Sequence, residues 1–306
     1  MRSLAIKNSN SLSYFCINWL SDTDGPGKRL VLFLQGCHLD CSWCHSPHSQ
    51  PQESPLLYFN SLCKKCRRCE NACKNEVHLF NEKNEHIINR DNCTKCGACI
   101  EACPQSSGYT SSGSLVLPTK KTSVAHLFNT IKPQLDLLKS AGGITFTGGE
   151  PLLQYQALSL LAQKCKDAGI NTALETSGIV PLQSIRQIAP SIDTWLIGMR
   201  LTTGTNTFGE AYLEKKTRET LAYLSQLPSK KIIVRIPIIP GYTTTEKYLD
   251  KVRRILEEHN LKDIEILRHN PESAHYYNAL GLPGKIPYNA SLANEKYTYV
   301  SQFFIN

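Results

Sequence analysis

The chain lacks any long uninterrupted apolar run, and this excludes two classes of protein. No segment approaches the roughly eighteen apolar residues that mark a candidate membrane-spanning helix. The N-terminal residues 1–21 lack the unbroken apolar core and the small-residue cleavage site of a signal peptide. We therefore expect a cytoplasmic protein with no membrane partner, in which thiols stay reduced and clustered cysteines act as metal ligands.

The chain also lacks a concentrated stripe of basic residues. Its 306 residues carry a formal net charge of +8, with 41% hydrophobic and 20% charged residues, which are values of a globular protein. This length predicts one large domain or two smaller ones with an ample core. Because Lys and Arg are dispersed along the sequence, we expect no nucleic-acid partner.

Cysteine is the residue that the chain has in excess. Eleven of its 13 cysteines lie in three tight clusters. Cys37, Cys41 and Cys44 form a C-x3-C-x2-C run, which can hold three irons of a [4Fe–4S] cube and leave the fourth iron without a protein ligand. The pattern C-x2-C-x2-C-x3-C then occurs twice, at Cys63, Cys66, Cys69 and Cys73 and at Cys93, Cys96, Cys99 and Cys103.

The doubled run resembles the bacterial ferredoxins, in which the fourth cysteine of each run ligates the cluster of the other run. The resemblance implies two closed clusters, with ligands Cys63, Cys66, Cys69 and Cys103 for one and Cys73, Cys93, Cys96 and Cys99 for the other. Zinc is the alternative, but zinc sites favour paired C-x2-C elements. With three clusters bound to thiolates, the net charge falls to about +3.

Strands and helices alternate through most of the chain. The predicted strands cover residues 29–36, 143–149, 171–178, 193–199, 230–239 and 262–269. A helix is predicted over residues 122–140, kinked or broken near Pro133. Alternation of this kind predicts an α/β protein with a parallel sheet, and six units fit a partial (βα)6 TIM-like barrel.

The cysteine-dense residues 56–112 have little apolar periodicity, so they form a predicted ferredoxin-like 2[4Fe–4S] domain inserted into the barrel. The segments on either side are residues 1–55, with the first strand and the cysteine loop, and residues 113–306, with the remaining barrel. Two cysteines lie outside the clusters. We predict that Cys165 is buried on the apolar face of a helix, whereas Cys16 lies in a segment without regular pattern.

The three-cysteine run, with Trp43 between its last two cysteines, resembles the radical S-adenosylmethionine (SAM) superfamily. Gly148-Gly149-Glu150-Pro151 follows a predicted strand and resembles the element that binds the SAM amino group in that superfamily. The resemblance implies that SAM chelates the open iron and is cleaved by one electron to a deoxyadenosyl radical. The alternative is a zinc site completed by one of the nearby histidines, which are His38, His45 and His48.

Further motifs resemble the activating enzymes of glycyl radical enzymes. They are Asp24-Gly25-Pro26-Gly27, the eight-cysteine insert, Glu175-Thr176-Ser177-Gly178, and Arg235 with Pro240-Gly241. The resemblance implies SAM contacts at Trp43, Gly148, Gly149, Glu150, Thr176, Ser177, Arg200, Arg235 and His269. One departure is Gly198-Met199-Arg200, where the family usually has Asp-x-Lys. Arg200 can replace the lysine as a cation for the SAM carboxylate, but Gly198 supplies no carboxylate for a monovalent cation.

The family resemblance implies an oxidoreductase with three [4Fe–4S] clusters and SAM as cofactors. It would be a monomer that removes a hydrogen from a backbone glycine of a partner glycyl radical enzyme in an anaerobic cell. Flavodoxin or ferredoxin would reduce the insert, and the insert would relay electrons to the SAM site. Two alternatives remain open from sequence, namely a radical SAM enzyme acting on a small molecule or peptide, and a non-catalytic ferredoxin-like electron carrier.

Overall fold

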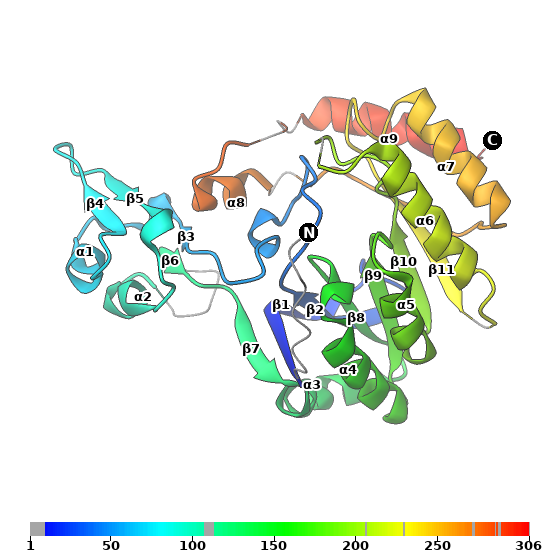
Figure 1. The fold of residues 1–306 in the computed structure, drawn as a ribbon, viewed down its shortest axis with the longest axis horizontal. Helices are drawn as coiled ribbons and strands as arrows, with labels where there is room; N and C mark the ends of the chain where they lie inside the picture. Colours follow the sequence, from blue (N-terminus) through cyan, green and yellow to red (C-terminus); the bar gives the residue numbers. More distant parts are fainter. Residues whose placement is uncertain are drawn as a thin grey trace.

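A mostly parallel sheet with helices packed against it forms the main body of the protein (Figure 1). The computed structural model describes residues 10–106, 113–205, 207–228, 230–270, 273–284, 286 and 289–305. Its large sheet has the strand order β12-β11-β10-β9-β8-β2-β1-β7. Six neighbouring strands are parallel: β2 (Lys28–Leu34), β8 (Gly142–Gly148), β9 (Asn171–Thr176), β10 (Thr194–Gly198), β11 (Lys231–Pro237) and β12 (Ile264–Leu267).

All six predicted strands are confirmed, and the protein is an α/β protein with a large parallel sheet. Two antiparallel strands, β1 (Ser11–Ser21) and β7 (Lys120–Ser123), extend the sheet beyond β2. Cys16 lies in β1, so the expectation of an irregular segment there was wrong. Backbone pairing with β2 and β7 holds this strand, although most of its side chains are only half-buried or exposed.

Helices follow the parallel strands in chain order. They are α3 (Val124–Leu138), α4 (Tyr155–Asp167), α5 (Leu182–Ile188), α6 (Glu210–Leu224), α7 (Glu246–Glu258), α8 (Ser273–Leu280) and α9 (Ala290–Ile305). Helix α3 begins at a capping residue, because the Ser123 hydroxyl accepts a hydrogen bond from the His126 N–H. It continues as one helix through Pro133, so it is not broken there. Among the described residues, no helix is long and apolar enough to cross a membrane.

The core lies between the sheet and these helices. Leu30, Phe146 and Trp195 project from three strands and are fully buried, and the helices add residues such as Ile131 and Leu161. Cys165 is fully buried in the same core, as predicted for a small apolar side chain. This packing fixes the strand ends, where the predicted SAM contacts lie.

Between β2 and α3, the cysteine-rich segment forms a lobe of its own (Figure 1). Strands β3 (Leu57–Tyr58) and β6 (Leu115–Val116) pair at its base, and β4 (His78–Phe80) pairs with β5 (His86–Ile88) near its tip. Two short helices, α1 (Arg68–Ala72) and α2 (Ala98–Ala102), carry the cysteine runs. The predicted end of the insert at residue 112 lies outside the described residues. The remaining short elements are 3₁₀ turns: η1 (Pro47–Ser49), η2 (Asn60–Leu62), η3 (Arg90–Asn92), η4 (Pro151–Gln154) and η5 (Ala189–Ser191).

Candidate metal centres and SAM site

The loop that follows β2 brings the first three cysteines together. The Gly36 N–H donates to the Ser49 carbonyl at 2.8 Å, and the Cys37 N–H donates to the Gln50 carbonyl at 3.0 Å. A further bond from the Cys44 N–H to the Cys41 carbonyl closes a tight turn at 3.1 Å. The loop therefore folds back on itself at the carboxyl end of β2, where chemistry in parallel α/β barrels is found.

The three thiols of this loop lie in an apolar, crowded environment. Burial raises the pKa of the Cys37 thiol, and the charges of Glu150, Cys44 and Cys41 raise it further. All three cysteines pack with Leu39 and Trp43 in one hydrophobic cluster. Thiolates that repel one another in such a site need a bound cation, and an iron–sulfur cluster supplies it because coordination deprotonates the thiols. The donor set therefore fits a metal centre.

Trp43 is buried beside the cysteines. Its ring centroid lies 5.4 Å from that of Tyr242, and its Nε1 is buried without a hydrogen-bond partner among the described residues. A buried indole N–H normally finds an acceptor. Its position fits a polar ligand beside the cysteine loop.

The glycines at the end of β8 are required by packing against the cysteine loop. A Cβ on Gly149 would lie 2.2 Å from the Gly36 carbonyl oxygen, and one on Gly148 would lie 2.4 Å from the Leu34 amide nitrogen. Gly148 also has a φ of +114°, which strongly favours glycine. These two residues thus hold the backbone of β8 against the segment that carries Cys37.

Glu150 is buried, and its carboxylate holds two neighbouring segments in place. Oε1 accepts from the Leu152 N–H at 3.2 Å and from the Thr176 hydroxyl at 2.7 Å. Oε2 accepts from the Ser177 N–H at 3.0 Å and from the Ser177 hydroxyl at 2.6 Å. With two hydrogen bonds at each oxygen, the carboxylate fixes the loop after β9 to the start of η4. The structure thus brings Glu150, Thr176 and Ser177 together, as a positioning network.

Arg235 of β11 is buried and lies between two acids. Its Nη1 is 3.1 Å from Glu175 Oε2, and its Nε donates to Glu265 Oε2 at 2.8 Å. Burial alone would raise the pKa of Glu175, but Arg235, a hydrogen bond from Thr147 and the charge of Arg200 outweigh it and lower the pKa. Arg235 therefore joins β9, β11 and β12 across the sheet.

Arg200 lies over the position where the chain has Gly198. A Cβ on Gly198 would come within 3.3 Å of Arg200 Nη1, so the missing side chain makes room for the guanidinium. Its only hydrogen bond among the described residues is a long one to the Met199 carbonyl, at 3.4 Å. Its charge lowers the pKa of the nearby Glu175, but no ion pair engages it in the described part of the chain. A guanidinium has the fork geometry that suits a carboxylate. His269, just after β12, is buried, and burial followed by the charge of His45 lowers its pKa.

The two four-cysteine runs have the same local fold. In each, a 3₁₀ turn ends directly before the first cysteine, and a short helix ends directly before the fourth. The residues before the two helices, Arg67 and Gly97, both have positive φ, at 60° and 84°. The sequence repeat is thus also a structural repeat.

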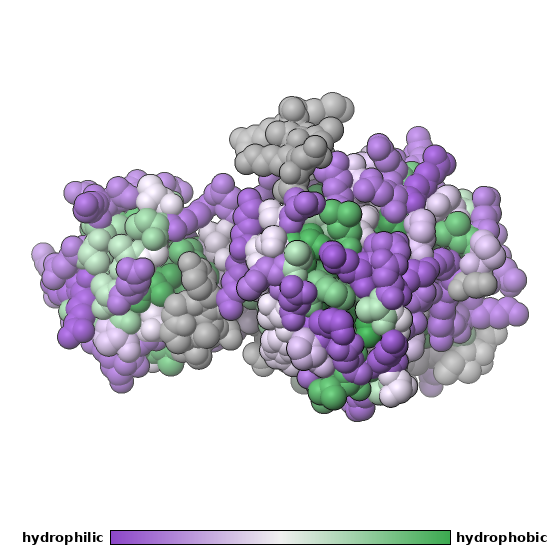
Figure 2. Space-filling model, turned by 90° about the horizontal axis from the view of Figure 1, so that it is seen from below, coloured by the Kyte–Doolittle hydropathy of each residue, from purple (hydrophilic) through white to green (hydrophobic). Residues whose placement is uncertain are grey.

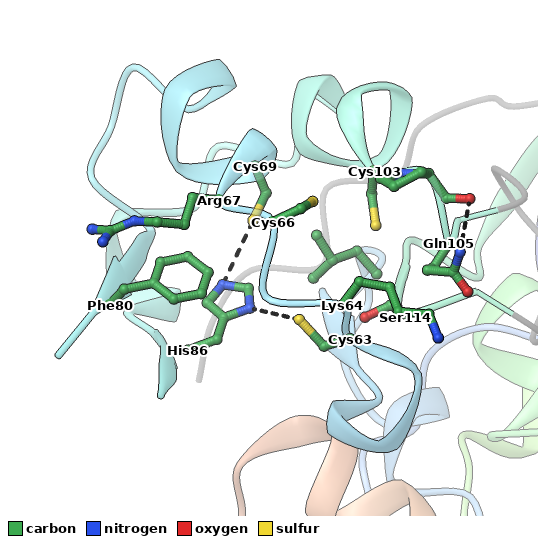
Figure 3. Close-up of a pocket in the computed structure, with 12 residues that line it drawn as sticks. Cys63, Lys64, Cys66, Arg67, Cys69, Phe80, His86, Cys103, Gln105 and Ser114 are labelled. Carbon is green, nitrogen blue, oxygen red and sulfur yellow. Dashed lines mark hydrogen bonds between the residues drawn. The ribbon is translucent and has the colours of Figure 1, made fainter. Parts of the chain in front are cut away.

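Each cavity of the insert is lined by cysteines from both runs. One is lined by Cys63, Cys66, Cys69 and Cys103 (Figure 3), and the other by Cys73, Cys93, Cys96 and Cys99. These are the two sets expected from the ferredoxin resemblance, in which the fourth cysteines exchange. Burial raises the pKa of Cys69 to about 11 and that of Cys99 to about 12, so here too a bound metal is needed to keep the thiolates.

A pair of histidines beside the first cavity was missed by the sequence analysis. His86 Nδ1 lies 3.6 Å from Cys63 Sγ and its Nε2 lies 3.7 Å from Cys69 Sγ (Figure 3). His78 Nδ1 lies 3.0 Å from His86 Nε2, so Cys69 and the two histidines could also hold a metal ion. Each histidine begins a short run with apolar residues, and the two runs are separated by residues 81–85. This pattern predicts a hairpin, and the two runs are the strands β4 and β5.

Comparison with known proteins agrees with an iron–sulfur site. A family model described as "4Fe-4S single cluster domain" matches residues 23–197, more than half of the chain. A 4-hydroxyphenylacetate decarboxylase activating enzyme of Clostridium scatologenes is 28% identical over 95% of this chain and 94% of its own length. An isethionate sulfite-lyase activating enzyme of Desulfovibrio desulfuricans is 29% identical, covering 87% and 86%. A (2S)-3-sulfopropanediol dehydratase activating enzyme of Klebsiella oxytoca is 33% identical, covering 86% and 83%.

The sheet, the three-cysteine loop and the matched family model define an iron–sulfur protein of the radical SAM type. More particularly, the chain belongs to the family of glycyl-radical-enzyme activating enzymes and is an oxidoreductase of that family.

Proposed function

We propose that this chain activates a partner glycyl radical enzyme by reductive cleavage of SAM and abstraction of hydrogen from a backbone glycine. The observation that carries the proposal is the loop after β2, where three cysteines pack together among apolar side chains. The eight cysteines of the two four-cysteine runs line the two cavities of the insert. A [4Fe–4S] cluster held by Cys37, Cys41 and Cys44 supplies, when bound, an open iron for SAM and the electron that cleaves it.

Zinc with a histidine as fourth ligand is less well supported at this loop. His38 Nε2 faces the Ile179 carbonyl oxygen at 2.7 Å. The His48 ring lies against Tyr276 at a tilt, with 4.0 Å between the ring centroids. These contacts favour a structural role for His38 and His48, so a zinc site at this loop would use His45, which directly follows Cys44.

We further propose that SAM lies across the carboxyl ends of the parallel strands. Arg200 would bind its carboxylate, and the buried Trp43 Nε1 would donate to it, since neither group has a strong partner within the described residues. Gly148 and Gly149, which hold the end of β8 against the cysteine loop, would place their backbone beside the amino group. Glu150, Thr176, Ser177 and Arg235 would fix the loops of the site, and His269 would close it at β12.

In the proposed architecture, the parallel sheet is a partial (βα)6 barrel and residues 56–112 are an inserted ferredoxin-like domain. The insert would hold two further [4Fe–4S] clusters and relay electrons from flavodoxin or ferredoxin, for a total of three clusters in a monomeric, cytoplasmic protein. In support, each cavity collects four cysteines in the crossed arrangement of a two-cluster ferredoxin.

The partner is an enzyme whose chain carries a glycine that becomes a stable radical. Relatives of this chain are named as activating enzymes of a decarboxylase, a sulfite-lyase and a dehydratase. The test is anaerobic incubation of the reconstituted protein with such an enzyme, SAM and dithionite, followed by electron paramagnetic resonance (EPR). We expect a glycine-centred doublet, which Cys41→Ser abolishes and Cys16→Ser, at an exposed cysteine of β1, retains.

The two alternatives give different results in the same experiment. The first alternative predicts that deoxyadenosine forms but no glycyl doublet appears with any glycyl radical enzyme whose gene lies beside the gene of this protein. That result would favour a small-molecule or peptide substrate. Reduced clusters without any deoxyadenosine would favour a non-catalytic electron carrier.

A further inference from the structure

The two four-cysteine runs share a fold but differ in charge. Between its first three cysteines, the first run has a lysine or arginine at every position, whereas the second run has one lysine and three uncharged residues. The positions are Lys64, Lys65, Arg67 and Arg68 in the first run, and Thr94, Lys95, Gly97 and Ala98 in the second. All four basic side chains of the first run are exposed, and we refer to them as the basic collar.

Little within the described residues neutralises the basic collar. Arg67 Nε pairs with Glu70 Oε2 at 2.6 Å, but no ion pair in the described part of the chain engages Lys64, Lys65 or Arg68. In the second run, the single cation Lys95 pairs with Glu53 at 2.5 Å. The side chains of the first loop therefore carry more positive charge than those of the second, and the charges of two like clusters would not alter this difference.

Two residues of the basic collar lie at the cavity in Figure 3. Lys64 and Arg67 line that cavity together with its four cysteines, and Cys66 is exposed in the middle of the loop. The lobe stands apart from the sheet, and hydrophilic residues cover its outer edge (Figure 2). The segments before both runs contact α8 of the main body, since the Phe59 ring stacks on His275 with 4.7 Å between centroids and Arg90 donates to the Ala279 carbonyl at 2.7 Å.

We infer that the basic collar is the docking surface for a small acidic one-electron carrier protein of the flavodoxin type, which delivers electrons at the first cavity. This inference rests on the proposed function. In the transfer, the carrier's anionic flavin hydroquinone becomes the neutral semiquinone, and one [4Fe–4S]²⁺ cluster becomes [4Fe–4S]⁺. One electron moves and no proton is needed.

The physical basis is electrostatic steering. Exposed charges act over a Debye length of about 8 Å at physiological ionic strength, so closely spaced cations on one loop add their fields. Such patches raise association rates by about 10- to 1000-fold, and the gain falls steeply with salt. An acidic carrier would therefore meet the first run faster than the less positive second run.

The test is a charge-reversal pair, Lys65→Glu with Arg68→Glu, in the cluster-loaded protein. The matched control is Lys247→Glu with Lys262→Glu, two exposed lysines of the main body that change the net charge equally. Stopped-flow reoxidation of flavodoxin hydroquinone gives the second-order rate constant. At low salt we expect this rate constant to fall by about tenfold or more in the collar pair and by less than about twofold in the control pair. Near 1 M salt the rate constants of the two pairs and of the unmodified protein should converge.

Equal losses in the two pairs, or no loss in the collar pair, would overturn the inference. Iron content must match the unmodified protein, so that a folding defect is recognised. Deoxyadenosine formation driven by dithionite separates this inference from the proposed function, because it bypasses docking. We expect the rate of deoxyadenosine formation to be unchanged in both pairs. If the unmodified protein forms no deoxyadenosine with dithionite, the proposed function fails instead. Loss of the glycyl radical with dithionite present would assign the collar to the partner enzyme and also refute carrier docking.

Discussion

Replacing Glu150 should loosen the loop after β9, because this carboxylate accepts four hydrogen bonds. In Glu150→Leu, the hydroxyls of Thr176 and Ser177 can rotate to other partners, but the N–H groups of Leu152 and Ser177 lose their acceptors. Hydrogen bonds to charged groups contribute about 1.5–3 kcal/mol each, so the two N–H groups together should cost about 3–6 kcal/mol. In Glu150→Gln, either orientation of the amide leaves only one N–H without an acceptor, at about half that cost.

Hydrogen exchange of the peptide containing Ser177 measures this effect directly. Only the Ser177 N–H bond, at about 1.5–3 kcal/mol, governs exchange of this peptide, and each 1.36 kcal/mol corresponds to a factor of ten, so we expect exchange to accelerate about 10- to 100-fold in Glu150→Leu. In Glu150→Gln the acceleration should be smaller, because one orientation of the amide keeps that bond. Glu265→Gln is the matched control, because that carboxylate binds Arg235 and does not contact Ser177. Its Ser177 peptide should exchange like that of the unmodified protein.

The competing explanation is a direct contact between Glu150 and the SAM amino group. In that case SAM affinity would fall in Glu150→Leu while exchange at Ser177 stayed unchanged. That result would refute the assignment of Glu150 as a positioning residue.

Three other outcomes follow from the geometry of the sites. Because Cys63 and Cys103 line one cavity, replacing either with serine should abolish the same EPR signal and lower the iron content from about twelve to about eight per chain. The control Cys165→Ser should retain about twelve irons. His86→Phe should lower the midpoint potential of that cluster alone by about 50 mV, from the loss of one hydrogen bond to sulfur, and an unchanged potential would exclude such a bond. Gly149→Ala should cost about 1–3 kcal/mol of unfolding free energy and weaken SAM binding, whereas Gly284→Ala, with no atom within 4 Å of its added Cβ, should do neither.

The six parallel strands and the clustering of the cysteines could be predicted from the sequence for physical reasons. Buried parallel strands are continuous apolar runs, such as residues 29–34, and each of the six predicted runs is a strand of the sheet. The spacing of three cysteines over seven residues allows few arrangements, and the exchange of the fourth cysteines was implied by the resemblance to bacterial ferredoxins. The crossed cavities lined by Cys73 and Cys103 agree with that reasoning.

Contacts between segments that lie far apart in the sequence could not be predicted from the sequence. The hydrogen bonds of Glu150 to Ser177 depend on how two neighbouring strand ends meet, which no local pattern encodes. The same holds for the pairing of Arg235 with Glu265. His86 contacts Cys63 only because the chain forms a hairpin at residues 81–85. Strand β1 was not predicted because few of its side chains are buried, so its sequence has no clear apolar pattern.

The central claim is that one of the protein's clusters, held by Cys37, Cys41 and Cys44, has an open corner for SAM. EPR of the dithionite-reduced protein before and after addition of SAM tests it most directly. We expect SAM to shift the signal of one cluster and leave the others unchanged, and Cys44→Ala to remove both that signal and the response. A reduced spectrum that is identical with and without saturating SAM would contradict the account.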